Sequence, residues 1–453
     1  MFIFYDIIFI LVFLFWYLPE YLFKGKFHFG FWMRLGIFPR QISQRLAGQR
    51  AVVGLPIAQA TGQRAIWLHA VSVGEVLASQ KLLSGLRKEY PDSQIVISTV
   101  TPTGNAVARK IAGPQDIVIY LPLDISFIAA AVACRINPYL VIIAETELWP
   151  NLIGVLNKRG IPIIIVNARI SDGSFRGYGL IRFLIRPVLN KISLFCLQTE
   201  SDARRLAALG ASPEKLLVTG NMKFDTSTSL SVNNADYADK KDDYADCRGR
   251  LGLKEGDKLL TAGSTHPGEE EIILRVYKEL LKDFPGLKLL IAPRHPDRAR
   301  EIEKLVLDCG FAPALISKLS RITNHESRTT IFILDTIGQL TSFYAVSDIV
   351  FVGKSLVNKG GQNILEPAFF AKPILFGPHM FNFREITALY LANQAAVMVK
   401  DEEELSRKIR FFLANPLEAD RLGRAGKELL SLNQGATERN LEAIKKGVRS
   451  LFP

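Results

Sequence analysis

The sequence predicts an α/β protein built from two doubly wound domains, and three observations lead to this class. Short, continuously apolar runs alternate with amphipathic stretches from residue 65 onward. Continuous apolar runs are typical of parallel strands that are buried on both faces, and their alternation with helices indicates a parallel sheet covered by helices. The alternation stops in a polar stretch at 226–250 and restarts at 258, so the chain divides into two domains of similar build.

The first domain is predicted from apolar runs that form strands and from amphipathic stretches that form helices between them. The expected strands are 65–70, 94–100, 116–123, 139–145, 161–167 and 194–199. The expected helices are 75–88, 103–111, 125–136 and 148–158. Together they make a Rossmann-like domain that spans residues 23–225.

The second Rossmann-like domain repeats this build over residues 251–453. The expected strands are 258–264, 287–293, 330–335, 348–353 and 373–377, and the expected helices are 269–282, 297–309 and a closing helical stretch at 402–449. Residues 226–250 are polar, charged and low in large aliphatic side chains, which predicts a linker with a mobile loop. The cleft between two such domains is where a ligand is expected.

Composition narrows the class of protein and of partner. The chain has 453 residues, of which 48% are hydrophobic and 22% charged, so it can form two cores and is not a disordered or low-complexity chain. The 56 Lys and Arg outnumber the 44 Asp and Glu, and the resulting charge of +12 favours anionic partners such as nucleotides or phospholipid surfaces. The four cysteines lie far apart, which argues against a disulfide scaffold and a zinc site.

The first 18 residues are apolar or aromatic except for Asp6. A cleaved signal peptide is disfavoured because the run has neither a basic start nor a small-residue cleavage site. A buried helix of the first domain is a second interpretation, and a membrane anchor at residues 1–22 is the one that the sequence favours. A full span needs about 20 apolar residues, so spanning and in-plane insertion both stay open. Seven basic residues and no acidic one lie between Glu20 and Glu75, which predicts that the rest of the chain is cytoplasmic.

Residues 67–75 run from a strand through a glycine turn into a helix, and they carry the first candidate for catalysis. One interpretation is a capping box, in which Ser72 caps the helix and Glu75 caps back three residues later. The other is catalytic: Gly74 lets a substrate approach the backbone, and Glu75 lies at the carboxyl end of a strand as a general base. The sequence leaves both interpretations open.

Three further charged residues of the first domain can be interpreted from their positions in the sequence. Glu145 ends the apolar run 139–145, where an unpaired carboxylate is costly, so it is expected to hydrogen-bond a specific partner. Glu147 is interpreted as an acid in the first turn of the helix at 148–158. Lys223, just before the linker, is either a surface charge or a cation that neutralises a phosphate or carboxylate in the cleft.

The second domain offers sites suited to an anion and a nucleotide. Hydroxyl side chains at 264–265 lie where a helix starts, and Arg294 lies at another strand end. At 360–367 a glycine pair opens a helix whose first turn carries Asn363 and Glu366. Such glycines admit a phosphate to helix N–H groups, and Glu366 can accept both hydroxyls of a ribose. The alternative is that the glycine pair is a plain turn.

An ordered set of motifs between residues 67 and 435 resembles the 3-deoxy-D-manno-octulosonic acid (Kdo) transferases, which add Kdo to lipid A precursors in Gram-negative bacteria. The motifs are LHAVSVGE, TPTG, ETELWPN, NARIS, GNMKFD, STHPGEE, PRHP, GGQNILEPA, GPHMFNF and NQGA. The resemblance implies a GT-B fold, in which the two Rossmann-like domains face a cleft, together with an N-terminal membrane anchor. It also implies that the first domain binds the acceptor and the second binds CMP-Kdo.

The resemblance implies roles for individual residues. Glu75 is the proton acceptor, and Glu145 and Lys223 stabilise the transition state. The residues expected to contact CMP are Pro293, Arg294, Ile337, Gly338, Gln339, Asn363, Ile364, Leu365 and Glu366. Three positions depart from the family's usual pattern: Lys354 stands where glycine is frequent, Gln362 where histidine is common, and Gln339 where glutamate is common. The departures concern donor contacts and not the reaction class.

The implied reaction is attack by a sugar hydroxyl of the lipid on the anomeric carbon of CMP-Kdo, without a metal or a cofactor. The expected partners are CMP-Kdo, a lipid A precursor (lipid IVA) and the cytoplasmic side of the inner membrane. Nucleic acid is not expected, because the basic excess lies next to the anchor and no aromatic RNA-binding motif occurs. Two alternatives stay open: a GT-B enzyme that uses a UDP-sugar on another lipid, and a catalytically inactive, membrane-tethered nucleotide-binding protein.

Overall fold

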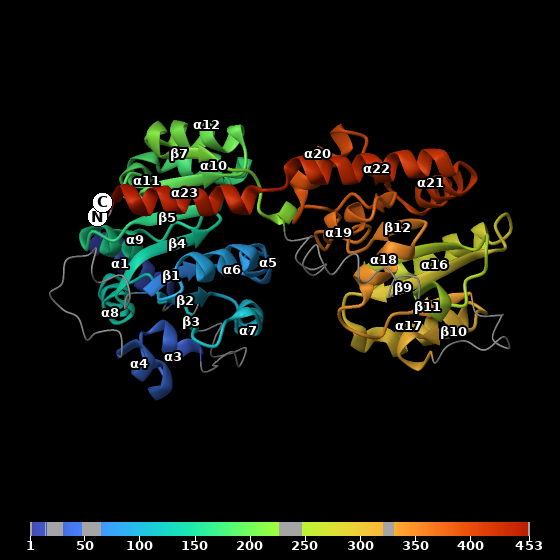
Figure 1. Cartoon of the computed structure of the whole chain (residues 1–453), viewed down its shortest axis with the longest axis horizontal. Helices are drawn as coiled ribbons and strands as arrows, with labels where there is room; N and C mark the ends of the chain where they lie inside the picture. Colours follow the sequence, from blue (N-terminus) through green and yellow to red (C-terminus); the bar gives the residue numbers. More distant parts are fainter. Residues whose placement is uncertain are drawn as a thin grey trace. The chain divides into compact units, whose positions relative to one another are not determined.

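The computed structural model describes residues 2–13, 15, 30–47, 65–225, 247–319 and 330–451, which belong to two compact units (Figure 1). Unit 1 is Met1–Thr226 with Gln434–Pro453, and unit 2 is Ser227–Asn433. Of the predicted linker, residues 226–246 lie outside the described part, whereas Cys247 is buried in a core of unit 2. The described end of the predicted linker therefore belongs to the folded second unit.

Unit 1 is built on a seven-stranded parallel sheet with the strand order β3-β2-β1-β4-β5-β6-β7. The strands are β1 (Ala65–His69), β2 (Gln94–Thr99), β3 (Ile117–Tyr120), β4 (Pro138–Ala144), β5 (Ile163–Ala168), β6 (Leu194–Leu197) and β7 (Leu216–Val218). The order runs outward in both directions from β1 and β4, as in a doubly wound sheet. The sequence does not predict β7, because three partly exposed residues make no distinct apolar run.

Helices cover both faces of this sheet, because consecutive residues of a strand point to opposite sides. In β1, Trp67 packs into one core, and Ile66 and Leu68 pack into the other. The helices between the strands are α5 (Val73–Ala78), α6 (Gln80–Glu89), α7 (Pro102–Ile111), α8 (Ser126–Ile136), α9 (Pro150–Lys158), α10 (Asp172–Leu180), α11 (Arg182–Leu189) and α12 (Glu200–Leu209). The single helix predicted at 75–88 is divided at Ser79 into α5 and α6.

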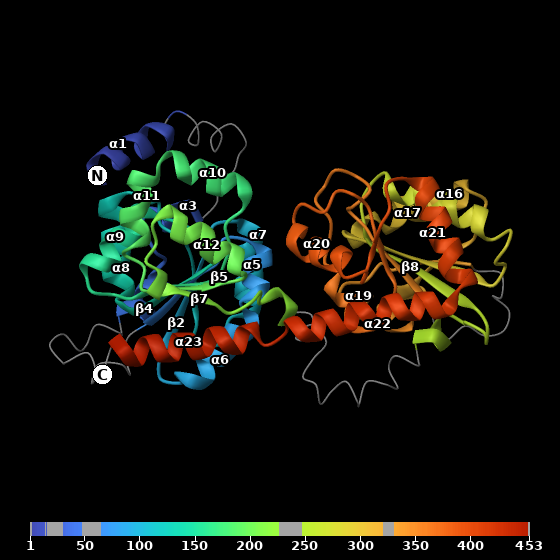
Figure 2. The same cartoon turned by 90° about the horizontal axis from the view of Figure 1, so that it is seen from above.

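The last helix, α23 (Ala436–Leu451), packs against α6, β5 and β6 of unit 1 (Figure 2). Its Ile444 is fully buried in a core of that unit. At its start, the N–H groups of Gly435 and Thr437 donate to the buried carboxylate of Asp225. The sequence assigns this helix to the domain at 251–453, and the structure corrects that boundary, because the apolar face of α23 completes the core of unit 1.

The N-terminal helix, α1 (Phe2–Val12), lies against unit 1, where Phe9 and Phe13 pack on the core. The Asp6 carboxylate accepts hydrogen bonds from Ser126 N at 3.0 Å and from Asn151 Nδ2 at 2.6 Å. Two short helices, α3 (Gly30–Arg34) and α4 (Arg40–Ala47), precede the sheet. Within the described residues, no helix has the length and apolar character needed to cross a membrane. The anchor at 1–22 therefore stays a prediction.

Unit 2 contains a second seven-stranded parallel sheet, with the order β10-β11-β9-β8-β12-β13-β14. Its strands are β8 (Lys258–Thr265), β9 (Leu287–Pro293), β10 (Pro313–Leu315), β11 (Ile331–Ile333), β12 (Ile349–Val352), β13 (Ile374–Phe376) and β14 (Val397–Met398). Its helices are α16 (Glu269–Leu280), α17 (Ala299–Asp308), α18 (Leu340–Val346), α19 (Leu365–Phe369), α20 (Arg384–Ala392), α21 (Glu402–Ala414) and α22 (Pro416–Asn433). Two predicted α/β domains with parallel sheets are thus confirmed, and the outermost strands β10 and β14 are additions to the prediction.

Candidate functional site

The candidate residues of unit 1 gather at the carboxyl edge of its sheet, where Glu75 follows β1, Glu145 follows β4 and Lys223 follows β7. Lys223 Nζ donates to Glu145 Oε1 at 2.9 Å. On the other side, Arg169 Nε, after β5, lies 4.0 Å from Glu145 Oε2. The sequence predicts a specific hydrogen-bond partner for Glu145, and the structure provides two cations, Lys223 and Arg169. Lys223 is itself one of the candidate site residues.

Backbone strain accompanies this ion pair. Glu145 has a φ of 58°, in the left-handed region that non-glycine residues seldom adopt, and its N–H donates to Val166 O at 2.9 Å. Asn167, on the neighbouring strand, has a φ of 54°, and its Oδ1 accepts from Met222 N at 2.9 Å. That hydrogen bond ties the backbone beside Lys223 to the strand that follows β4. Such outliers cluster at functional sites, where the surrounding structure enforces them.

Glu75 is the third residue of α5, and its carboxylate turns back to residues that precede the helix. Oε2 accepts from Val71 N at 2.6 Å, and Oε1 accepts from Ser72 Oγ at 2.9 Å. The Ser72 side chain makes no hydrogen bond to an N–H group of α5. The predicted capping box is therefore not formed, because Glu75 accepts the N–H of Val71 and not that of the N-cap residue Ser72, and the Ser72 hydroxyl donates to the carboxylate.

The surroundings of Glu75 raise the pKa of its carboxyl to about 7. Burial is the largest cause and the nearby charge of Glu145 the next, while the hydrogen bonds from Val71 and Ser72 lower the pKa. Burial and then Glu145 also raise the pKa of Glu147, to about 6. Carboxyl groups with pKa values near neutrality exchange protons at physiological pH, which is what proton-transfer chemistry requires.

Glu147 does not lie in a helix, so its interpretation as a first-turn acid is wrong. The helix α9 begins at Pro150, three residues later, because proline is favoured at a first helical position and fixes the start there. Glu147 lies instead among the carboxylates of the sheet edge, where its charge raises the pKa of Glu75. It also acts on α10, where burial and then Glu147 raise the pKa of Tyr178.

Two further residues lie at this edge of the sheet that the sequence did not predict as site residues. Arg169, already described beside Glu145, belongs to the NARIS motif. His69, in the LHAVSVGE motif, is buried at the end of β1, with Nδ1 3.0 Å from Ser98 Oγ and its ring in an edge contact with Trp149. Burial lowers the pKa of His69 to about 4, so the ring is neutral at physiological pH. Both motifs were visible in the sequence, but neither residue follows a pattern that marks a site.

In unit 2 one buried carboxylate organises the carboxyl edge of the sheet. Glu269 Oε2 accepts from His266 N at 2.9 Å and Lys354 N at 2.6 Å, and Oε1 accepts from Ser355 N at 2.8 Å and Leu356 N at 2.9 Å. These bonds join the end of β8 to the end of β12. The start of α16 was predicted to suit an anion, and in the structure the carboxylate of Glu269 occupies this position.

Three of the predicted donor contacts lie close together. Burial raises the pKa of Glu366, while the Asn363 amide and the positive charge of Arg294 lower it. Asn363 Nδ2 lies 3.4 Å from Glu366 Oε1, and Asn363 Oδ1 accepts from Leu365 N at 3.1 Å. The side chains of Ile364 and Leu365 are fully buried, so these residues could contact a ligand only through their backbone N–H and C=O groups.

The other predicted donor contacts lie at strand ends or in a loop. Pro293 is the last residue of β9, and Ile337 is 87% exposed in the loop before α18. Gly338 has a φ of 88°, and the buried Oε1 of Gln339 has no hydrogen-bond partner among the described residues. Their part in CMP binding stays a prediction.

The glycine pair at 360–361 has a steric reason in the fold itself. Gly360 and Gly361 have φ values of 96° and 74°, and a Cβ atom would lie 2.4 Å from Asn382 Nδ2 or 2.1 Å from Met380 Sδ. The close approach of 380–382 therefore requires both glycines. Because α19 begins at Leu365, Asn363 lies before the helix and not in its first turn.

Among the described residues, no group of three or more His, Cys, Asp or Glu side chains is arranged so that it could hold a metal ion. The expected independence of a metal and of a cofactor stays a prediction.

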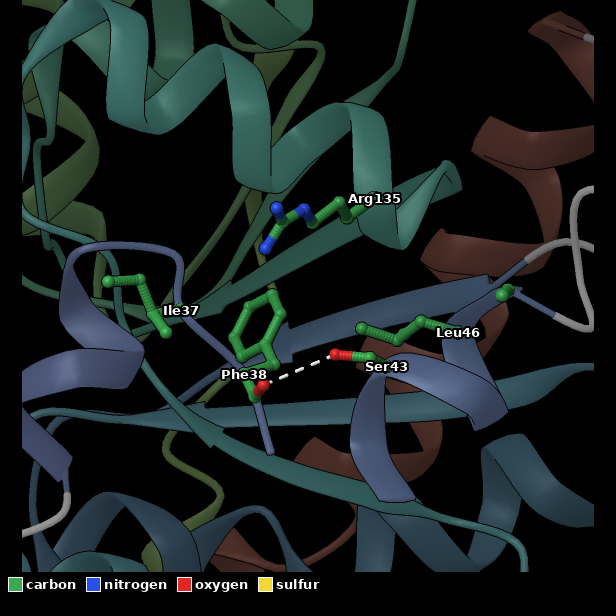
Figure 3. Close-up of a pocket in the computed structure, with 6 residues that line it drawn as sticks. Ile37, Phe38, Ser43, Leu46 and Arg135 are labelled. Atoms are coloured by element: carbon green, nitrogen blue, oxygen red, sulfur yellow. Dashed lines mark hydrogen bonds between the residues drawn. The ribbon is translucent and has the colours of Figure 1, made fainter. Parts of the chain in front are cut away.

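A cavity of about 340 Å³ in unit 1 contains none of these candidates. It is lined by Ile37, Phe38, Ser43, Leu46, Ala47 and Arg135 (Figure 3). The Arg135 guanidinium, from α8, lies 5.9 Å from the centre of the Phe38 ring. Residues 48–64, which follow α4, lie outside the described part, and we assign no ligand to this cavity.

Comparison with known proteins identifies the family. A family profile described as 3-deoxy-D-manno-octulosonic-acid transferase (kdotransferase) matches residues 35–226. The 3-deoxy-D-manno-octulosonic acid transferase of Haemophilus influenzae is 38% identical over 405 residues, which cover 89% of this chain and 91% of the relative. This chain belongs to the Kdo transferase family. The enzyme of the same name from Chlamydophila psittaci is 31% identical over 84% of both chains.

Family membership makes the chain a glycosyltransferase of lipopolysaccharide biosynthesis and confirms the predicted enzyme class. The fold has relatives beyond the Kdo transferases. UDP-GlcNAc 2-epimerase from Neisseria meningitidis superposes with a TM-score of 0.57 at 12% identity, covering 85% of this chain and 100% of the epimerase. At that identity the likeness concerns the fold alone, and it agrees with two parallel-sheet domains of the GT-B kind.

The Glu269 carboxylate yields a prediction about stability. Glu269→Gln should lower the free energy of unfolding of unit 2 by about 2–4 kcal/mol, because a neutral amide oxygen cannot satisfy four N–H groups. Chemical denaturation of the full chain measures this change. The control is Glu271→Gln, an exposed acid of the same helical turn, for which a change within about 0.5 kcal/mol is expected. Equal losses in the two variants would contradict the organising role of Glu269.

Proposed function

We propose that this Kdo transferase moves Kdo from CMP-Kdo to the lipid A precursor lipid IVA, with Glu75 as the general base. The observation that carries the proposal is the pKa of about 7 at Glu75, next to the ion pair of Glu145 and Lys223. A base works best when its pKa lies near the working pH, because it is then both deprotonated and able to hold the proton that it takes.

The reaction needs a proton acceptor for the attacking hydroxyl. As the acceptor oxygen bonds to the anomeric carbon of Kdo, the bond from that carbon to the phosphate oxygen breaks and CMP leaves. The hydroxyl proton passes to Glu75. Since the hydrogen bonds from Val71 and Ser72 hold both carboxylate oxygens in place, the base is positioned before the substrate arrives.

Glu145 and Lys223 contribute electrostatically to this proposal. The charge of Glu145 raises the pKa of Glu75 and so increases its basicity. Lys223 supplies a fixed positive charge that suits the negative charge developing on the departing phosphate. Because the Lys223–Glu145 bond already orients the ammonium group, little reorganisation is needed during the reaction.

Unit 2 is proposed to bind CMP-Kdo through Arg294, Asn363 and Glu366. The Glu366 carboxylate, held by Asn363, can accept the ribose hydroxyls, and Arg294 can pair with the phosphate. The remaining predicted contacts come from residues 293 and 337–339 and from the backbone at 364–365. Family membership supports this donor, because CMP-Kdo is the donor that the resemblance implies.

Membrane attachment at the cytoplasmic side of the inner membrane is proposed for unit 1. The outward side of α1 leaves Ile7 and Leu11 about half exposed, which suits an in-plane position at a lipid surface. Leu180 and Phe183, where α10 meets α11, are 85% and 74% exposed, and Arg182 lies between them. Apolar side chains beside a positive charge suit an anionic lipid surface.

The catalytic role of Glu75 predicts the outcome of Glu75→Gln. The amide can still accept a hydrogen bond, but it cannot take a proton, so transfer should fall by about 10²-fold or more while the protein melts normally and binds CMP. Purified protein is assayed with CMP-Kdo and a tetraacyl lipid A precursor, and the products are resolved by mass.

The matched control is Glu89→Gln on α6, which removes a carboxylate paired with Lys445 and should leave transfer unchanged. Near-wild-type turnover by Glu75→Gln under saturating substrates would show that the mechanism is wrong. A wild-type protein that uses a UDP-sugar and not CMP-Kdo would instead overturn the assignment of the donor.

The raised pKa of Glu75 predicts an acid limb in the pH profile. Glu75 must be deprotonated to act, so kcat/KM should fall about tenfold for each pH unit below about 7 and level off above it. Ser72→Ala removes a hydrogen bond that lowers this pKa and should move the limb to higher pH. A limb near pH 4–5, the usual range of a glutamate, would contradict the assignment.

The ribose role of Glu366 predicts weaker nucleotide binding in Glu366→Ala. Loss of a buried hydrogen-bond partner should weaken CMP affinity by about 1–3 kcal/mol, measured by calorimetry. Glu403→Ala, at an exposed acid of α21, is the control and should bind CMP normally. If the CMP affinity of Glu366→Ala is unchanged, Glu366 does not bind the ribose and its role is structural.

A further inference from the structure

Lys354 adopts a backbone conformation that its side chain does not favour. It follows Gly353 at the end of β12 and has a φ of 61°, in the left-handed region. Glycine adopts this region freely, and lysine adopts it at a free-energy cost. A strained non-glycine residue at a strand end is a reason to look for a role of the side chain itself.

The surrounding structure fixes this conformation whatever the side chain is. The N–H groups of Lys354, Ser355 and Leu356 all donate to the buried Glu269 carboxylate, and Lys354 O accepts from Gly361 N at 2.7 Å. These contacts are made by the backbone, so a glycine at 354 would form them without strain. The lysine side chain therefore contributes nothing to this turn that explains its presence.

The lysine ammonium lies in a group of positive charges at the carboxyl edge of unit 2. The strands β9, β8 and β12 are neighbours in the sheet, and Arg294 N, after β9, donates to Thr265 O, at the end of β8, at 3.0 Å. Burial, followed by the charges of Arg294 and Lys359, lowers the pKa of Lys354. An anion bound among these cations would relieve their mutual repulsion.

The acids of the same edge have other partners. Glu269 accepts the backbone N–H groups described above, Glu270 pairs with Arg298, and Glu366 lies beside the Asn363 amide. Within the described residues, no carboxylate comes within ion-pair distance of Lys354 Nζ or of the Arg294 guanidinium. The two cations are thus available to an anion from outside the chain.

We propose that Lys354 is an additional donor-binding residue, whose ammonium pairs with an anionic oxygen of the bound nucleotide sugar. The anionic oxygen belongs to the phosphate or to the sugar carboxylate, which share this chemistry. The inference rests on the proposed function, since it needs a donor of this class in unit 2. It explains the lysine at this position: Arg294 and Lys354 hold the donor's anion from the ends of β9 and β12, the two strands on either side of β8.

The charge is tested with Lys354→Met, which removes the ammonium and keeps a side chain of similar length. Calorimetry with CMP and with cytidine, together with the KM for CMP-Kdo, separates the two anions. A loss of about tenfold in CMP affinity with unchanged cytidine binding assigns the phosphate. A rise of about tenfold in the KM for CMP-Kdo with unchanged CMP affinity assigns the carboxylate. Lys354→Arg should restore most of either loss.

The strain is tested with Lys354→Gly, which should raise Tm by about 2–4 °C while it weakens donor binding as Lys354→Met does. The matched control is Gln394→Gly, because Gln394 is exposed after α20 and has a φ of 51°. This control should raise Tm similarly and leave CMP affinity and the KM unchanged. A residue with a purely structural role would not combine higher stability with weaker binding.

The inference is wrong if Lys354→Met keeps both the CMP affinity and the KM for CMP-Kdo within twofold of a wild-type protein that binds CMP. A wild-type protein that binds neither CMP nor CMP-Kdo overturns the proposed function, and this inference with it. The two failures are distinguishable, because the first appears only in the variant and the second already appears in the wild type.

Discussion

A parallel sheet with helices on both faces leaves polar side chains few places other than the ends of its strands. Every residue of β1 and β4 is buried, so no charged group can be placed along them without losing its hydration. The carboxyl ends of the strands are open to the loops, and Glu75, Glu145 and Lys223 follow strands there. The positions of all the candidate residues depend on this constraint.

The same edge in both units stores conformational strain and unbalanced charge. Glu145 and Lys354 both have left-handed backbones at strand ends, and each carries a charged side chain that a glycine could not supply. In unit 1 the carboxylates of Glu75 and Glu147 share their surroundings with Glu145, which raises both pKa values. In unit 2 the excess is positive. Strained and like-charged groups are unfavourable for folding, so their presence at both edges indicates a role other than stability.

Most of the fold could be predicted because the local signals were strong. The buried strands are continuous apolar runs, and the helices between them carry one apolar side. The strands that escaped prediction are the outermost ones: β7, β10 and β14 have two or three residues each, which is too short for a distinct apolar pattern. The helices α10, α11 and α12, between residues 172 and 209, were not predicted either. The assignment of α23 failed for another reason, because an amphipathic pattern indicates that a helix is buried on one side but not which core receives it.

The sequence by itself determined the two doubly wound domains, the family, and the residue types of the candidate site, because motif spacing and apolar periodicity are local properties of the chain. Only the tertiary structure decided which side chains meet. It paired Glu145 with a lysine 78 residues away, turned Glu75 back onto Val71, and placed Glu147 among like charges. These outcomes depend on burial and on the distances between charges, which arise only when separate strand ends come together at one edge of a sheet.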